Sequence, residues 1–288
     1  MQLKIQTGRM LSAFILGAGL SVLPACSSTP YLHSLFHGSR TETAEDARFR
    51  SEYPRLKALL RQNNFRQALE WVDSWEKGQS LSDENLRLLR KDRRTIQLIG
   101  SAYYMGVARE RKKAGRYHGA LTALKIAQGF SPADPLLRRE ILKARARIIV
   151  QGEVGQDWSD MVQRLLALKA KNPSDSAIDP TISWAYAGLA GSEFTSGHYD
   201  LAYAHSHMAL SYNNKEDKAL TVRDRVSEIV NGIVGKAEAA YRRHLFDEAR
   251  TELERALTID PDSKRARKDW RILSETLKMP SVPSNVNR

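Results

Sequence analysis

Cysteine is almost absent from this chain, which has Cys26 as its single thiol among 288 residues. One thiol cannot close an internal disulfide. The short signatures of common enzymes are also missing, since the sequence holds no Walker-type phosphate loop, GxSxG elbow, HExxH pair or CxxC motif. We therefore expect that the protein is not an enzyme and that it needs no metal, other cofactor or small-molecule substrate.

Long apolar runs are equally scarce, and the one that stands out lies near the first residue. Residues 10–22 (MLSAFILGAGLSV) carry no charge and follow Lys4 and Arg9. The length of this run is typical of the core of a signal peptide and is too short for a membrane-spanning helix. The segment predicts an export signal.

The next four residues, 23–26 (LPAC), resemble the processing box of bacterial lipoproteins. The resemblance implies that residues 1–25 are a signal peptide, and that Cys26 becomes the mature N-terminus and carries diacylglyceryl and palmitoyl lipid. Because Ser27 rather than an aspartate follows the cysteine, the same resemblance implies an anchor in the bacterial outer membrane, facing the periplasm. The alternatives are a secretory signal cleaved near Ala25 and an uncleaved anchor.

Acidic residues are outnumbered by basic ones, and the formal net charge is +12. Such a balance favours anionic partners, which include acidic proteins, lipid head groups, acidic polysaccharide and nucleic acid. The export signal argues against nucleic acid. Basic residues gather in several helical segments, and either a solvated helix face or a binding surface accounts for any one of these clusters.

Strand-like alternation is absent, whereas apolar residues recur at intervals of three and four. Residues 45–278 are therefore expected to form one helical domain, after a flexible tether at 26–44 and before a disordered tail at 279–288. Several helix starts are marked by an aspartate followed by a proline. The expected helices cover residues 45–62, 65–77, 83–113, 117–129, 135–150, 158–171, 180–196, 199–212, 216–243, 246–258 and 262–277.

Four short segments share one local pattern, in which an aromatic residue stands three positions before an alanine. In the clearest copy Gly115 precedes the aromatic residue, Leu124 and Ala127 continue the apolar face, and Pro132 follows it. This pattern resembles the tetratricopeptide repeat, a hairpin of two helices. The four pairs are Phe65 and Ala68, Tyr117 and Ala120, Tyr199 and Ala202, and Phe246 and Ala249.

The resemblance implies an all-α fold, a right-handed solenoid of stacked helical hairpins. It is best over residues 101–134, 183–214 and 230–261 and weak over 49–80. Residues 135–171 are interpreted as an additional hairpin or, alternatively, as an interruption of the solenoid. The alanines of the four copies are separated by 52, 82 and 47 residues, compared with a usual period of about 34. We therefore expect irregular repeats with lengthened first helices.

The same resemblance implies a concave groove lined by the first helix of each hairpin. Cations beside aromatic residues would suit a peptide that carries acidic groups, through charge-assisted hydrogen bonds and apolar anchors. The residues expected in this groove are Met105, Arg109, Lys112, Lys113, Trp184, Phe194, Tyr241 and Arg242.

These features together favour a lipid-anchored scaffold that binds envelope proteins during outer-membrane protein assembly or secretion, the latter in a pilotin-like role. An alternative is a structural lipoprotein whose basic helix faces contact peptidoglycan or acidic polysaccharide. Co-sedimentation with peptidoglycan separates the two hypotheses, because salt-sensitive binding without a protein partner favours the alternative. An enzyme that acts on envelope polymers is a third possibility, but the sequence displays no convergent acid and base groups.

Overall fold

The computed structural model describes residues 43–78, 81–152 and 157–277. These residues form eleven α-helices and one 3-10 turn and contain no β-strand. Cys26, the expected tether as far as residue 42 and the tail at 279–288 lie outside the described residues, whereas Thr43 and Ala44 of that tether already belong to the cap and start of the first helix. The helices are α1 Ala44–Arg61, α2 Phe65–Gly78, α3 Asp83–Lys113, α4 Tyr117–Phe130, α5 Pro135–Gln151, α6 Trp158–Ala170, α7 Asp179–Thr195, α8 Tyr199–Tyr212, α9 Asp217–Arg242, α10 Phe246–Ile259 and α11 Lys264–Leu277, with the 3-10 turn η1 at Ser176–Ile178.

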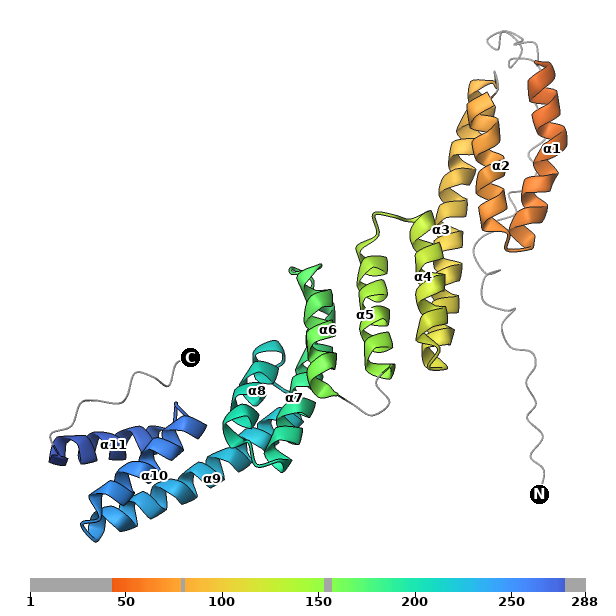
Figure 1. Cartoon of the computed structure of the whole chain (residues 1–288). Coiled ribbons are helices and arrows are strands. Elements are labelled where there is room, and N and C mark those ends of the chain that lie inside the picture. Colours follow the sequence, from red (N-terminus) through yellow and green to blue (C-terminus); the bar gives the residue numbers. More distant parts are fainter. Residues whose placement is uncertain (1–42, 79–80, 153–156, 278–288) are drawn as a thin grey trace, which may run out of the picture.

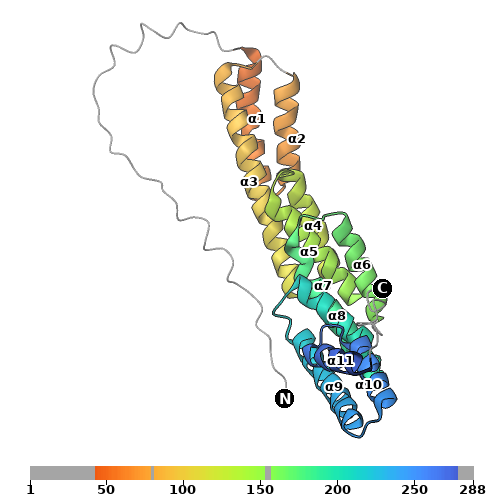
Figure 2. The ribbon, with the colours of Figure 1, turned by 90° about the vertical axis from the view of Figure 1, so that its left-hand side faces the viewer.

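The helices stack in the order of the sequence, which makes the molecule an all-α helical solenoid. Figure 1 shows an elongated stack that runs from α1 at one end to α11 at the other, and the view in Figure 2 agrees. The most extensive contacts lie within the hairpins α3–α4, α7–α8 and α9–α10. Two first helices are long, as expected: α3 has 31 residues and α9 has 26.

The four predicted bends adopt one conformation. In the second bend the backbone N–H of Arg116 donates to the carbonyl of Arg111 at 2.9 Å, and the other three bends have the same bond at 2.9–3.0 Å. This bond belongs to the Schellman motif, which ends a helix with one residue in the left-handed region. That residue has a φ of 58° at Asn63, 70° at Gly115, 82° at Gly197 and 63° at His244.

The alanine that follows each bend is buried against the first helix of its hairpin. The exposed fractions of Ala68, Ala120, Ala202 and Ala249 are all 1% or less. A small side chain at this position lets the two helices approach closely. The burial of all four alanines agrees with the sequence pattern.

Helix α5 packs against helices on both of its sides and so connects the α3–α4 hairpin to the helices that follow. Leu137 and Ile141 pack into a core formed with α3 and α4. Leu142 and Ala146 pack into a different core, which includes residues of α6, α7, α8 and α9. Residues 135–170 therefore continue the solenoid as an extra pair of helices.

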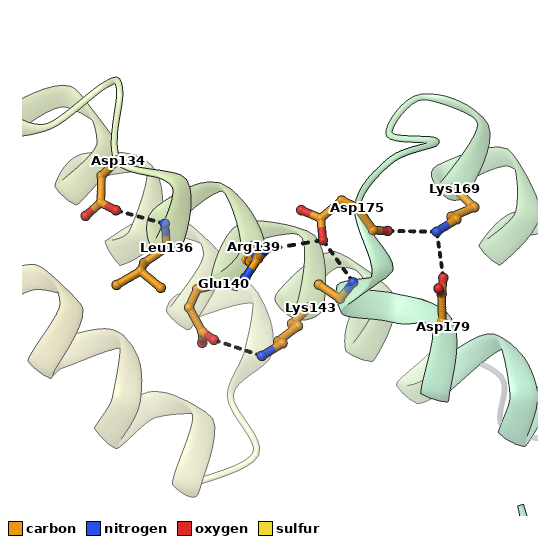
Figure 3. A network of polar contacts seen from close by, with 9 residues as sticks. Asp134, Leu136, Arg139, Glu140, Lys143, Lys169, Asp175 and Asp179 are labelled. Carbon is orange, nitrogen blue, oxygen red and sulfur yellow. Dashed lines mark hydrogen bonds and ion pairs between the residues drawn. The ribbon is translucent and has the colours of Figure 1, made fainter. Parts of the chain in front are cut away.

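Polar contacts strengthen the same junction (Figure 3). The ammonium of Lys169 on α6 donates to the carbonyl of Asp175 at 2.8 Å and to Oδ1 of Asp179 at 2.7 Å. Arg139 on α5 lies 3.9 Å from the carboxylate of Asp175. These contacts join α5, α6 and the start of α7 across the turn η1.

Within the described ranges, each helix is too short or too polar to cross a membrane.

Candidate partner-binding surface

A cavity of about 320 Å³ lies between α9, α10 and α11, and we call it the α9 cavity. Tyr241 and Arg242, both expected in the groove, contribute to its wall. Its remaining polar side chains are two carboxyl groups, and its apolar floor comes from all three helices. The lining residues are Ala237, Glu238, Tyr241, Arg242, Ala249, Leu253, Asp269, Ile272 and Leu273.

The two carboxyl groups of the α9 cavity have pKa values shifted in opposite directions. Nε and Nη2 of Arg265 donate to the same oxygen of Glu238 at 2.9 and 2.7 Å, and these bonds lower the pKa of Glu238. Burial, and next the facing carboxyl of Glu238, raise the pKa of Asp269. Oδ2 of Asp269 is shielded from solvent and has no donor among the described residues. The cavity therefore combines an apolar floor with a carboxyl oxygen that is shielded from solvent.

A second cavity, of about 460 Å³, lies between α6, α7 and the first half of α9, and we call it the α7 cavity. Phe194, expected in the groove, is part of its wall. The wall also has three hydroxyl groups and two cations but no acidic side chain. The lining residues are Trp158, Gly188, Gly191, Ser192, Phe194, Thr195, Lys218, Thr221, Val222 and Arg225.

The N-terminal cap of α6 and the contact with α7 together position Trp158 in the α7 cavity. Asp157 caps α6 by accepting the backbone N–H of Ser159 at 2.9 Å, which fixes Trp158 as the first helical residue. Its ring lies so close to α7 that a Cβ on Gly188 would be 2.3 Å from it. Trp184 meets the same ring edge-on, with 5.1 Å between centroids. The structure thus brings Trp184 next to the cavity that contains Phe194.

The cations expected on α3 have partners of their own. Lys112 forms an ion pair with Glu140 of α5, and Lys113 pairs with Glu110 at 3.0 Å on its own helix. Burial alone would raise the pKa of Glu140, but Lys112 and then Lys143 lower it below its ordinary value. Lys112 therefore bridges two helices.

The other two residues expected on α3 differ in exposure. Met105 packs partly buried against the core of α3, α4 and α5. Arg109 is exposed. The expected groove residues therefore divide into three places, which are the end of α3, the α7 cavity and the α9 cavity.

The lining residues that were not expected from the sequence include Trp158, Lys218, Arg225 and Asp269. Trp158 lies on α6, in the additional hairpin, which the repeat pattern does not assign to the groove. Lys218 and Arg225 lie in the lengthened part of α9 that has no counterpart in a repeat of ordinary size. Their spacing of seven residues, which returns to nearly the same face of a helix, was the available signal.

No protein-family model matches the chain, and no curated protein is similar to it. The function is therefore inferred from the solenoid and from the chemistry of the α7 and α9 cavities.

Proposed function

We propose that this protein is a lipid-anchored scaffold at the periplasmic side of the bacterial outer membrane, where it binds protein partners during envelope assembly or secretion. The anchor is the lipid on Cys26. Such a scaffold could serve as a subunit of the outer-membrane protein assembly machine or as a pilotin for a secretin ring. A stack of helical hairpins supports the proposal, because such stacks present extended surfaces for binding.

The α9 cavity is the observation that carries this proposal. Leu253, Ile272 and Leu273 provide apolar surface for a side chain of the partner, while Tyr241 and Arg242 provide donors at the edge. Ligand sites in proteins are commonly apolar concavities of about 300 Å³ or more with a few polar groups that set orientation. A protein partner that inserts an apolar side chain would use both parts of the wall.

Site-specific photocrosslinking in cells tests the scaffold. A photoreactive phenylalanine replaces Ile272, which is 40% exposed in the cavity wall, and a control replaces Leu98, which is 69% exposed on α3. We expect a discrete crosslinked protein from position 272 that disappears when Arg242→Glu and Tyr241→Ala are added. Identical crosslinks from both positions, or crosslinks unaffected by the added changes, contradict binding at this cavity.

The anchor is tested separately. Labelled palmitate should enter the wild-type protein and be absent from the Cys26→Ser variant. Label that persists in this variant refutes lipidation at Cys26.

A structural lipoprotein that contacts acidic glycans is the second candidate function. The exposed cations Arg145 and Arg147 on α5 favour it, because they add basic surface outside both cavities. Co-sedimentation with purified peptidoglycan in the absence of other proteins, lost in Arg145→Gln/Arg147→Gln, would support this candidate in place of the scaffold.

A further inference from the structure

We propose that the α7 cavity binds a glutamate or aspartate side chain from an acidic segment of the protein partner, with Lys218 and Arg225 as its charge partners. This inference rests on the proposed scaffold function and deepens it by assigning a chemical class to the segment that is bound. It also gives a role to two cations that the repeat pattern does not place in the groove.

The wall of the α7 cavity is positively charged. Lys218 and Arg225 line the cavity, and the wall contains no carboxylate. Arg225 is exposed and makes no ion pair or hydrogen bond with any described residue. An anionic group that enters the cavity therefore meets a guanidinium whose donors are available, and charge-assisted hydrogen bonds of this kind are the stronger ones.

Lys218 is already held in position at the wall of the α7 cavity. Its aliphatic stem lies against α7, since a Cβ on Gly191 would be 3.0 Å from Cε of Lys218. Its ammonium group lies over the ring of Trp158, 5.2 Å from the centroid. A cation–π contact leaves the N–H groups of lysine able to donate to another acceptor. Less side-chain entropy is then lost when a carboxylate binds.

The aromatic and apolar side chains of the wall suit a peptide better than a sugar. Acidic sugars commonly stack on the face of a large aromatic ring, but the larger of the two rings in the wall, Trp158, is covered by Lys218, by the α7 backbone at Gly188 and by Trp184. The remaining apolar surface comes from Phe194 and Val222, which suits an aliphatic or aromatic side chain next to the carboxylate. The geometry therefore favours an acidic peptide segment over an acidic glycan.

Binding of defined probes to the detergent-solubilised full chain tests the inference. The probes are a rhodamine-labelled peptide GSELEFESG, its uncharged counterpart GSQLQFQSG, and a hyaluronate oligosaccharide with the same label. Fluorescence anisotropy at two salt concentrations gives the affinities. The test variant is Lys218→Gln/Arg225→Gln, and the control is Arg94→Gln/Lys125→Gln, which removes the same charge from exposed positions on α3 and α4.

We expect the glutamate peptide to bind about tenfold or more tightly than the glutamine peptide, as the loss of charge-assisted hydrogen bonds implies. The test variant should lose this preference, whereas the control should change affinity less than about twofold. Equal affinity for both peptides, or equal weakening in both double variants, overturns the inference. Hyaluronate binding that requires Lys218 and Arg225, without peptide binding, overturns it as well.

Failure of this inference can be distinguished from failure of the scaffold function. Photocrosslinks from position 272 report on the α9 cavity and do not depend on the α7 cavity. If those crosslinks form while the glutamate peptide does not bind, only the assignment of the acidic segment is wrong.

Discussion

At the scale of single residues, two exposed glycines have opposite roles. Gly197 ends α7 with a φ of 82°, whereas Gly232 lies within α9 and has no unusual φ. A Cβ at either position would have no neighbour within 4 Å. The effect of alanine at each position therefore reports on the backbone alone.

We predict that Gly197→Ala lowers the free energy of unfolding by about 1 kcal/mol, because L-residues are disfavoured at positive φ. Gly232→Ala should raise it by about 0.5–1 kcal/mol, because alanine is the better helix former. Urea titrations followed by far-ultraviolet circular dichroism measure both changes. Changes of the same sign would contradict the left-handed conformation at Gly197.

Asp46 joins the first residues of two helices through a buried carboxylate. Its Oδ1 accepts the backbone N–H of Ser82 at 3.1 Å and the amide of Asn85 at 2.6 Å, and its Oδ2 accepts the hydroxyl of Thr43 at 3.0 Å. The hydrogen bond from the Ser82 backbone N–H has the largest effect on the pKa of Asp46 and lowers it. Burial raises the pKa, and the hydrogen bonds from Asn85 and Thr43 lower it further. Together these effects lower the pKa from 3.8 to about 2.

This depressed pKa predicts how stability depends on pH. The contribution of Asp46 is fully present above about pH 4, where the unfolded carboxyl is also ionised, and is lost as the pH falls toward 2. Asp46→Asn should cost on the order of 1–3 kcal/mol at pH 6 through unsatisfied buried groups. The difference in the free energy of unfolding between the wild-type and variant proteins should become smaller between pH 4 and pH 2, as measured by urea titration. A constant difference would exclude the carboxylate as its source.

At the scale of helices, the sequence pattern was a reliable guide to the elements. All eleven expected helices are present, with ends within two residues of the expected ones, because each depends on local periodicity, caps and bends. Side-chain pairing between helices is not local. Lys112 was expected to face a groove, but its bond to Glu140 depends on how α5 packs against α3, which spacing within α3 does not encode.

The packing of Trp158 on α7 gives a prediction at the same scale. Gly188→Ala should lower the free energy of unfolding by about 1–3 kcal/mol, because the added methyl group overlaps the Trp158 ring. In a Trp158→Ala background the same change should be neutral or slightly stabilising, which makes the two substitutions strongly non-additive. A double-mutant cycle by urea unfolding measures this coupling. Additive effects would mean that the ring does not contact Gly188.

At the scale of the whole molecule, the cores follow one another along the stack. One core contains Phe49 and Trp75 of the first hairpin, and another contains Val234 and Trp270 near the other end. Each core contacts its neighbours through shared helices such as α5. A stack of this kind has a stability that is approximately a sum over repeats and the contacts between neighbours.

This arrangement predicts that a destabilising substitution in the middle of the stack weakens the neighbouring helices but not the two ends. Leu165 on α6 is fully buried, and Leu165→Ala should cost about 2–5 kcal/mol locally. Hydrogen exchange followed by mass spectrometry should show faster exchange in α5, α6 and α7, while α1, α2 and α11 keep most of their protection. Uniform loss of protection along the chain would show that the solenoid unfolds as a single cooperative unit. The local outcome would also mean that the α7 cavity, which includes a wall from α6, can be disrupted while the α9 cavity stays folded.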